Sequence, residues 1–326
     1  MIIRQLTPDQ FMLTGIKTAW EGFKESLIKK GHKVTKGGEY DIAYATSIDP
    51  ITYFRLKSIK GKPKIIRAAT TKDDLRGAYL IFDLFYKIII KYLTRFYSKA
   101  DRIITISKFA KKSLIEMGVK KKIDVVSCGV NLEKFKYSLI KRNKFRSDYK
   151  ISDEDIVVLC VGMPTMRKGI DLFIELARRF PKVKFYWVGK EIRFKTNWLK
   201  VKRLIKNKTS NVVFTGYVDD IVSAYCGADI LLFPTRSENE GLPVLEAGAC
   251  KLPVIANNLP VLREKIKNGV NGFLCNNIDE FTKRLKQLIN SRSLRRKLGY
   301  EANKMAKRYD IQVTTEKLIR MFNECL

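Results

Sequence analysis

Two glutamates are the side chains of this chain whose spacing first suggests chemistry. Glu238 and Glu246 are separated by seven residues. Glu238 follows the run Asp229–Phe233, which predicts a buried parallel strand, and Glu246 lies in a helix predicted from Leu242 to Cys250. Ligands of open α/β sheets bind at this carboxyl edge, where helix N-termini present free N–H groups and partial positive charge. The spacing therefore predicts a ligand site, against the alternative of two capping, solvent-exposed carboxylates.

Two neighbouring cations, Arg167 and Lys168, form the second candidate group. They lie in the segment Gly162–Gly169, which joins a predicted strand to a helix with an apolar face. An arginine offers phosphate oxygens a bidentate fork, and a lysine offers a point charge. A solvent-exposed basic turn is the alternative, but the helix N-terminus and the position at the carboxyl edge favour a phosphate site.

The first half of the chain offers weaker candidates. Asp73 and Asp74 follow the predicted strand Lys64–Ala68 and could bind an acceptor hydroxyl, although helix capping or solvent exposure explains the pair equally well. Gly15 lies at a predicted strand-to-helix turn, where a glycine lets the backbone approach a ligand closely. A plain turn glycine is at least as good an interpretation.

The composition argues against several other kinds of site. His32 is the only histidine, which nearly excludes a histidine-based metal site or a Ser-His-Asp triad. The six cysteines include no Cys-x-x-Cys pair, so we expect reduced, buried thiols of a cytoplasmic protein and neither a metal cluster nor a disulfide framework. We therefore predict no metal ligands.

The chain carries a formal net charge of +31, from 64 basic and 33 acidic residues. Such an excess requires an anionic environment or partner, and lipid headgroups, nucleic acid and phosphorylated substrates are the candidates. A lysine-rich solvent-exposed surface explains part of the charge but not its clustering. The sequence has no apolar run long enough for a membrane span and no signal-peptide pattern at its start, so we expect a cytoplasmic protein, with peripheral membrane binding as an option.

Residues 79–99 are the strongest candidate for membrane contact. They are dense in apolar and aromatic side chains, and Lys87, Lys91, Arg95 and Lys99 recur every four residues. An apolar helix with a basic stripe suits an anionic membrane surface. A core helix with one hydrated face explains the same pattern equally well.

The length of 326 residues favours two domains. Predicted strands alternate with helices in both halves, which is typical of doubly wound α/β domains with parallel sheets. The segment Asn131–Asp153 lacks clear periodicity and is rich in charge, so it is predicted to be the linker. We assign residues 1–140 to an N-terminal domain and residues 141–310 to a C-terminal domain. Residues 311–326 form a last helix that could return to the first domain.

Several segments match a known family in one order along the chain. They are Ser107–Ala110, Gly129–Phe135, Val161–Gly162, Arg167–Gly169, Phe214–Val218, Ala228–Asp229, Glu238–Ala247 and Asn271–Leu274. Together they resemble the family 4 glycosyltransferases, strongly from about Ile103 to Leu274 and more weakly before. The resemblance implies the GT-B fold, an α/β fold of two Rossmann-like domains whose parallel sheets face a central cleft. It also implies an acceptor bound by the domain of residues 1–140, a sugar nucleotide held mainly by the domain of residues 141–310, retention of anomeric configuration and no required metal.

The resemblance also implies roles for the candidates. Arg167, Lys168 and Glu238 would be the catalytic residues: the two cations bind the donor diphosphate, and Glu238 with the backbone after it holds the sugar hydroxyls. Glu246 would bind the ribose hydroxyls, and Gly216 to Val218 would lie near the base. The full donor-binding set is Gly15, Gly162, Arg167, Lys168, Gly216, Tyr217, Val218, Glu238, Asn239, Glu240, Gly241, Leu242, Pro243 and Glu246.

Four residues depart from the family pattern. Met163 replaces an arginine, Glu240 a phenylalanine and Lys251 a glycine, and Ala69 stands where the histidine of the first domain is expected. Arg167 could supply the diphosphate charge that Met163 does not.

The favoured hypothesis is a retaining, metal-independent hexosyltransferase without a cofactor. Its donor would be a UDP- or GDP-hexose, and its acceptor a lipid or lipid-linked glycan at the cytoplasmic face of an anionic membrane, contacted through residues 79–99. A glycosyltransferase acting on nucleic acid is a less favoured alternative that rests on the +31 charge. A degenerate GT-B protein that only binds nucleotide or scaffolds a partner is the non-enzymatic alternative. The sequence does not indicate the oligomeric state.

Overall fold

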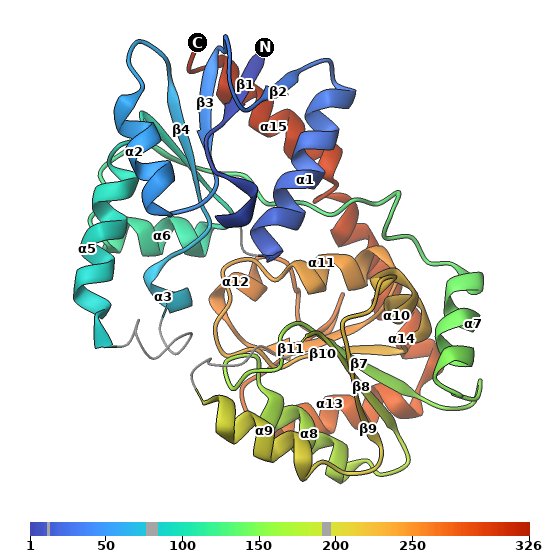
Figure 1. Cartoon of the computed structure of the whole chain (residues 1–326). Helices are drawn as coiled ribbons and strands as arrows, with labels where there is room; N and C mark the ends of the chain where they lie inside the picture. The colour runs from blue at the N-terminus through green and yellow to red at the C-terminus, as the bar shows by residue number, and fades with distance from the viewer. Residues whose placement is uncertain (12–13, 76–83, 191–196) are drawn as a thin grey trace. The chain divides into compact units, whose positions relative to one another are not determined.

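A computed structural model describes residues 1–11, 14–75, 84–190 and 197–326 of the chain. These residues form two compact units, each built on a six-stranded parallel sheet with helices packed against it (Figure 1). The first unit contains the described residues before Leu132 together with Tyr309–Leu326, and the second contains Leu132–Arg308. The α/β class predicted from the alternation of strands and helices is confirmed.

The sheet of the first unit has the strand order β2-β1-β3-β4-β5-β6, and all neighbouring strands are parallel. Its strands are β1 (Ile2–Gln5), β2 (Lys33–Thr35), β3 (Ile42–Ala45), β4 (Lys64–Ala68), β5 (Arg102–Thr105) and β6 (Ile123–Val125). The helices of this unit are η1 (Asp9–Phe11), α1 (Thr14–Lys29), α2 (Pro50–Ser58), α3 (Lys72–Leu75), α5 (Tyr86–Tyr97), α6 (Lys108–Glu116) and α15 (Ile311–Asn323). Every residue of β3 and β5 is buried, as expected for strands that helices cover on both faces.

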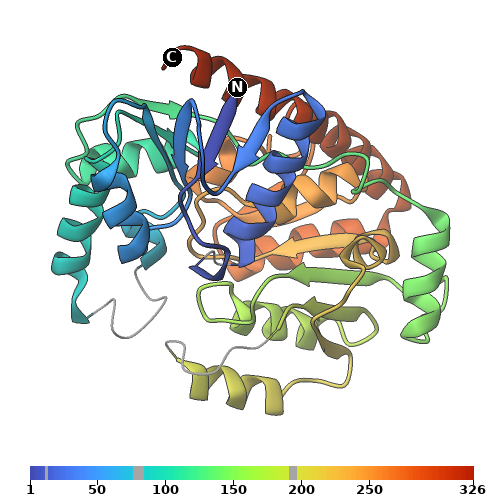
Figure 2. The same cartoon turned by 45° about the horizontal axis from the view of Figure 1, so that its top comes forward.

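The last helix of the chain is part of the core of the first unit. It packs along α1 and follows it in both views (Figure 1, Figure 2). Helix α1 buries Trp20, Phe23 and Leu27, whose spacing places them on one helix face. The ring of Phe322 in α15 lies edge-on to Tyr44 of β3, with 5.5 Å between ring centroids. The first unit is therefore completed by residues from the far end of the sequence.

The sheet of the second unit has the strand order β12-β11-β10-β7-β8-β9 and is also entirely parallel. Its strands are β7 (Val157–Val161), β8 (Lys184–Val188), β9 (Val212–Gly216), β10 (Ile230–Phe233), β11 (Val254–Asn257) and β12 (Phe273–Cys275). The helices are α7 (Leu139–Asp148), α8 (Ile170–Arg179), α9 (Trp198–Lys206), α10 (Ile221–Gly227), α11 (Leu242–Ala249), α12 (Pro260–Arg263), α13 (Ile278–Asn290) and α14 (Arg292–Lys307). Phe173, Phe185 and Trp187 fill the core between α8 and the sheet, with centroid distances of 5.0–5.4 Å. These edge-on contacts are the arrangement that aromatic rings prefer.

Helix α7 occupies the segment that the sequence predicts to be a linker, so that prediction is wrong for residues 139–148. The helix begins at Ser138, whose Oγ accepts a hydrogen bond of 3.3 Å from the N–H of Lys141. Its one large apolar anchor is Phe145, which is buried against Gly227 of α10. A single buried ring among many charged residues gives almost no helical periodicity, so the apolar pattern does not predict this helix.

Three smaller expectations also need correction. Asp73 and Asp74 lie in the short helix α3 and not in a loop, and Gly15 lies in the first turn of α1 and not in the turn before it. In the predicted helix over 79–99, residues 79–83 lie outside the described residues, and the described helix is α5. Among the described residues, we find no helix with the length and apolar character needed to cross a membrane.

Candidate active site

The strand order of the second sheet determines which loops meet. Strands β7 and β10 are hydrogen-bonded neighbours, although the chain builds β8 and β9 between them. The loops that leave two such strands separate in opposite directions, and ligands of open α/β sheets bind in the crevice between them. The segments Gly162–Gly169 and Thr235–Gly241 are the loops that follow β7 and β10. Both predicted groups of site residues therefore come from one switch point of the sheet.

The two loops contact each other through backbone and side-chain hydrogen bonds. The N–H of Arg236 donates to the carbonyl oxygen of Arg167 at 2.7 Å, and Nη1 of Arg167 donates to the carbonyl oxygen of Ser237 at 2.8 Å. Gly169, at a φ of +79°, lies so close to Pro234 that an added Cβ would be 2.3 Å from the proline carbonyl oxygen. Glycine is therefore required at this position, both for its conformation and for the close approach of the loops.

Lys168 and Glu238 form an ion pair across the two loops. Nζ of Lys168 lies 2.6 Å from Oε2 of Glu238, and the side chains are only 14% and 16% exposed. The same ammonium group lies 5.1 Å from the centroid of the Phe233 ring, within the range of a cation–π interaction. The structure thus brings together two of the three residues predicted to be catalytic, with Arg167 beside them.

The environment of Glu238 keeps its carboxylate ionised. Burial by itself raises the pKa of this group, but the ammonium of Lys168 opposes the effect by its charge and its hydrogen bond. The charge of Arg167 and a backbone hydrogen bond from Glu240 act in the same direction, and the resulting pKa is about 2. Glu238 is therefore a hydrogen-bond acceptor at any physiological pH.

The turn after Glu238 opens helix α11. Oε1 of Glu238 accepts a hydrogen bond of 3.2 Å from the N–H of Asn239. Gly241 is the N-cap at a φ of +81°, and an added Cβ would lie 2.8 Å from Leu262. A proline follows within the first two helical positions, where its missing N–H is not needed. The predicted residues Asn239–Pro243 thus form this turn and helix start directly after Glu238.

Glu246 lies in the second turn of α11 and has one strong hydrogen bond. The hydroxyl of Tyr225 donates to its Oε2 at 2.6 Å. Burial raises the pKa of Glu246, while the Tyr225 hydrogen bond and the positive charge of Lys134 lower it, and the net effect is upward. This hydrogen bond fixes the orientation of the carboxylate.

The other predicted donor residues lie at several places along the chain, and not all belong to the second unit. Gly162 ends the β7 side of the switch point, with a φ of +132°. Gly216 ends β9, two strands away from β7, and Tyr217 after it is 72% exposed while Val218 is partly buried. Gly15 belongs to the first unit, so its part in donor binding stays a prediction.

The predicted acceptor residues do not lie at the switch point of the first sheet. That point is between β1 and β3, whereas α3 with Asp73 follows β4. The N–H of Asp73 donates to Oγ1 of Thr71 at 3.3 Å, and the side chain of Asp74 lies outside what the structure describes. Their role as acceptor ligands stays a prediction.

Sequence reasoning missed several polar residues around these sites. Nδ2 of Asn257 donates to the carbonyl oxygens of Pro234 and Thr235 at 2.9 and 2.8 Å, which fixes the start of the loop after β10. The sequence could have indicated Asn257, because this residue lies at the carboxyl end of β11, the edge where α/β sheets bind ligands. Tyr225, by contrast, precedes Glu246 by 21 residues, and no local pattern links the two.

Two family models and several known proteins match this chain. A family model described as "Glycosyl transferases group 1" matches residues 141–305, and one described as "Glycosyltransferase Family 4" matches residues 15–134. The "Processive diacylglycerol alpha-glucosyltransferase" of Acholeplasma laidlawii is 32% identical over 289 residues, which cover 85% of this chain and 84% of that protein. The chain belongs to the family 4 glycosyltransferases. The resemblance inferred from its motifs is confirmed.

Other proteins are similar to this glycosyltransferase at lower identity. The "Alpha-galactosylglucosyldiacylglycerol synthase" of Streptococcus pneumoniae is 26% identical over 234 residues, which cover 69% of this chain and 62% of that protein. The crystal structure of Anabaena Alr3699/HepE in complex with UDP-glucose has a TM-score of 0.82 at 17% identity, with 99% of each chain covered. The structure of WaaG, a glycosyltransferase of lipopolysaccharide biosynthesis, has a TM-score of 0.71 at 16% identity, again over 99% of each chain. This glycosyltransferase has the GT-B fold.

Proposed function

We propose that this glycosyltransferase transfers a hexose from a UDP- or GDP-sugar to a membrane lipid or lipid-linked glycan, with retention of anomeric configuration and without a metal or cofactor. The observation that carries the proposal is the Lys168–Glu238 ion pair at the switch point of the second sheet. There a cation for phosphate and a carboxylate for sugar hydroxyls lie side by side, at the edge where α/β sheets bind ligands.

In the proposed reaction, the bond between the anomeric carbon and the diphosphate oxygen breaks while the acceptor oxygen bonds to the same face of that carbon. The acceptor's hydroxyl proton passes to the departing diphosphate oxygen, so a glycoside and a nucleoside diphosphate are the products. Negative charge grows on the diphosphate as the bond breaks. One pre-positioned donor to such a charge contributes about 3–4 kcal/mol, and no protein nucleophile is needed if the reactants are well aligned.

The geometry suits Lys168 to this role. An ammonium group has three N–H donors, so the single bond to Glu238 leaves two for phosphate oxygens. Glu238 restrains the lysine, and its ionised oxygens can accept hydrogen bonds from the sugar. Arg167 is oriented by its bond to the Ser237 carbonyl, and Glu246, oriented by Tyr225, is the proposed partner of the ribose hydroxyls.

The lipid acceptor is proposed from the relatives and from helix α5. The names of the Acholeplasma and Streptococcus relatives refer to diacylglycerol and to alpha-galactosylglucosyldiacylglycerol, respectively. At the start of α5, the apolar side chains of Leu84, Phe85 and Ile88 are 75%, 45% and 67% exposed. Exposed apolar residues beside a basic stripe are typical of helices that lie on anionic membranes.

The basic stripe of α5 is solvent-exposed. Lys87, Lys91, Arg95 and Lys99 line one open pocket with a volume of about 680 Å³ on the surface of the first unit. The opposite face of the helix buries Leu93, Phe96 and Tyr97 in the core. The helix is thus a core helix whose exposed face is basic and, at its start, apolar, and contact of this face with a membrane is our proposal.

The test is transfer of radiolabelled hexose from UDP-glucose or GDP-mannose into the organic phase, with vesicles of phosphatidylglycerol that contain diacylglycerol. We expect Lys168→Ala to lower kcat/KM about 10²–10³-fold, because one donor to the leaving diphosphate is lost. The exposed, unpaired Lys182 provides a matched control, and Lys182→Ala should transfer at the wild-type rate.

Two results would contradict the proposal. If neither UDP nor GDP raises the melting temperature of the wild type, the donor site is absent and the nucleotide-independent scaffold becomes the better interpretation. If label is transferred to added nucleic acid and never to lipid, the acceptor class is wrong.

A further inference from the structure

The second unit has another large cavity, at the opposite edge of its sheet. The cavity has a volume of about 720 Å³, and its lining includes Ala228–Asp229 and Leu252–Pro253. These residues immediately precede β10 and β11, so they lie at the amino ends of the strands, whereas the proposed donor loops follow the carboxyl ends of β7 and β10. Neither Lys168 nor Glu238 lines this cavity, which is thus distinct from their ion pair, although Tyr225, the hydrogen-bond donor to Glu246, belongs to its lining.

Basic side chains dominate the wall of this cavity, which we call the amino-edge cavity. They are Arg142, Lys251, Arg292, Arg295, Arg296 and Lys297, from α7, the turn after α11 and the start of α14. The lining contains one carboxylate, Asp229. The positive helix dipole at the start of α14 adds to the same field.

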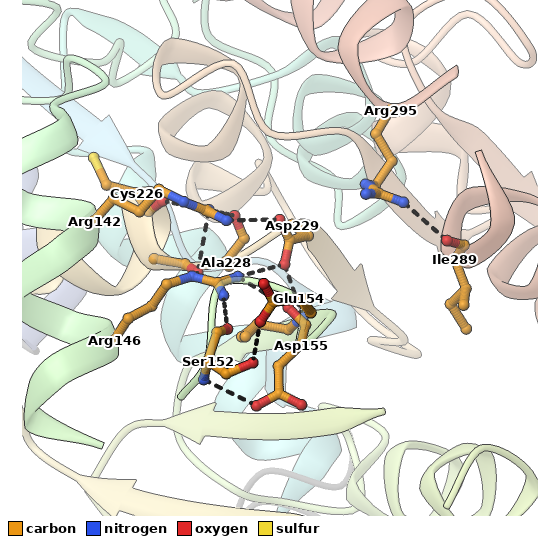
Figure 3. A network of polar contacts seen from close by, with 12 residues as sticks. Arg142, Arg146, Ser152, Glu154, Asp155, Cys226, Ala228, Asp229, Ile289 and Arg295 are labelled. Atoms are coloured by element: carbon orange, nitrogen blue, oxygen red, sulfur yellow. Dashed lines mark hydrogen bonds and ion pairs between the residues drawn. The ribbon is translucent and has the colours of Figure 1, made fainter. Parts of the chain in front are cut away.

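The single carboxylate is already engaged. Oδ2 of Asp229 lies 2.7 Å from Nη2 of Arg146, a side chain that is 3% exposed and does not line the cavity (Figure 3). The same oxygen accepts the N–H of Val157 at 2.9 Å, and Oδ1 pairs with Arg142 at 3.2 Å. Since Asp229 already pairs with Arg146 and Arg142, it leaves the charge of the other lining cations uncompensated.

Four of these cations are available to a ligand. The side chains of Lys251, Arg292, Arg296 and Lys297 are exposed, and none takes part in a salt bridge within the described part of the chain. Arg295 is held in place by the carbonyl oxygens of Leu288 and Ile289 at 2.6 and 2.9 Å, and Figure 3 shows the contact with Ile289. Burial lowers the pKa of Arg295, and the charges of Arg292 and Arg142 lower it further against the opposing effect of Asp229. The cations thus repel one another, which a bound anion would relieve.

The backbone of Lys251 fixes the place of its side chain. Its φ is +60°, and it follows the C-cap of α11 and ends that helix: its N–H donates to the carbonyl oxygen of Gly248 at 2.9 Å, and the N–H of Leu252 donates to that of Ala247 at 2.8 Å. The turn cannot easily relax, because Gly299 of α14 lies against it: an added Cβ would be 2.0 Å from the Lys251 carbonyl oxygen. The turn therefore holds a lysine on the wall of the cavity.

We propose that the amino-edge cavity binds a phosphate-bearing anion, separately from the nucleotide sugar. The arginines at the start of α14 supply bidentate donors and the lysines supply point charges, which is the chemistry that recognises phosphate esters. The exposed rings of Tyr137 and Tyr300 line the same cavity and offer apolar contact to the rest of the ligand. Two sources share this chemistry, the headgroup of an anionic phospholipid and a soluble phosphate ester.

The test uses inorganic pyrophosphate as the probe, titrated by calorimetry at constant ionic strength. Arg292→Gln with Arg296→Gln should raise its Kd at least about tenfold, because two charge-assisted contacts are lost. Lys283→Gln with Lys286→Gln removes the same charge from exposed positions on α13 outside the cavity, and should change Kd less than about twofold. Lys251→Gly, which also removes the left-handed strain, should weaken binding without lowering the melting temperature.

Equal losses in the α13 and α14 variants would mean diffuse attraction to the net charge and would overturn the proposal. So would the absence of pyrophosphate binding to the wild type, or its complete loss in Lys168→Ala, which would place the anion in the donor site. Sedimentation with vesicles of phosphatidylglycerol or phosphatidylcholine then identifies the source. If Arg292→Gln with Arg296→Gln abolishes binding to phosphatidylglycerol, the ligand is a lipid headgroup, and if vesicle binding is unchanged, it is a soluble ester.

Discussion

The ammonium of Lys168 and the carboxylate of Glu238 stabilise each other where neither is fully hydrated. A partly buried ion pair of this kind contributes little net stability, but removal of one partner leaves the other charge uncompensated. Variants at the two positions therefore differ from ordinary surface charge changes, since they affect folding as well as any ligand. Stability must be measured beside activity for each of them.

Glu238 should make the stability of the protein depend on pH in the acid range. The pKa of Glu238 is about 2 in the folded protein, below the 4.5 of an unperturbed glutamate. A depressed folded-state pKa contributes stability that is fully present above about 4.5 and is lost as the pH falls toward 2. In urea unfolding, the stability advantage of the wild type over Glu238→Gln should therefore shrink from pH 6 to pH 3. A difference that is constant with pH would show that Glu238 is not coupled to Lys168.

A second prediction concerns the orientation of Glu246. Tyr225→Phe removes the donor at 2.6 Å and leaves the ring in place, so the carboxylate loses its fixed geometry. The lost hydrogen bond should weaken UDP binding by about 1 kcal/mol, or several-fold in Kd by calorimetry. The 2′,3′-dideoxy analogue of UDP is the control, because it has no ribose hydroxyls and should bind both proteins alike. Equal weakening of both ligands would refute the ribose role of Glu246.

These residues differ in how far the sequence predicts them. Lys168 and Glu238 follow strands whose apolar runs are easily recognised, so topology alone brings them to one edge of the sheet. This shared position at the edge of the sheet is sufficient to predict that the two side chains lie close together. Tyr225 could not be predicted, because its contact with Glu246 depends on how α10 and α11 pack, which no local spacing encodes.

Strands and helices are predictable from the sequence to different degrees. The predicted strand Asp229–Phe233 agrees with β10, Ile230–Phe233, to within a residue, because buried parallel strands are continuous apolar runs. Helix α7 is the counterexample. It is held by Arg142 and Arg146, which bond to carbonyl oxygens and to Asp229, so its packing is polar and leaves no amphipathic pattern.

The stability of α7 gives the third prediction. Phe145 is 2% exposed and its ring packs where any side chain on Gly227 would clash, with an added Cβ 2.4 Å from the ring. Phe145→Ala should therefore destabilise the second unit by about 3–5 kcal/mol, seen as a lower urea midpoint for that unit. Ile140→Ala on the same helix is the control, because Ile140 is 82% exposed and should change stability little. Similar effects of both substitutions would mean that α7 is not docked through Phe145.

In the molecule as a whole, basic side chains gather at several separate places, each of which we propose to be a binding site. The stripe on α5, the Arg167–Lys168 pair and the amino-edge cavity each use cations at defined places, and the +31 total is partly their sum. The sequence indicates the total and the stripe, because these are matters of count and period. It cannot indicate the amino-edge cavity, whose cations come from three segments far apart along the chain.

Because α15 belongs to the first unit, the second unit can be removed from the chain as one continuous segment. Gly129–Val130 and Tyr309–Ile311 are paired: the N–H of Val130 donates to Tyr309 at 2.8 Å, and the N–H of Ile311 donates to Val130 at 2.9 Å. Residues 132–308 are thus an uninterrupted insert whose two ends begin at neighbouring points of the host. We expect a gene for 132–308 alone to give a folded fragment whose melting temperature rises with UDP, since the domain has its own core. The first unit should likewise fold alone when a short linker joins Asn131 to Tyr309. If circular dichroism shows that the 132–308 fragment is unfolded, the two units cannot be separated.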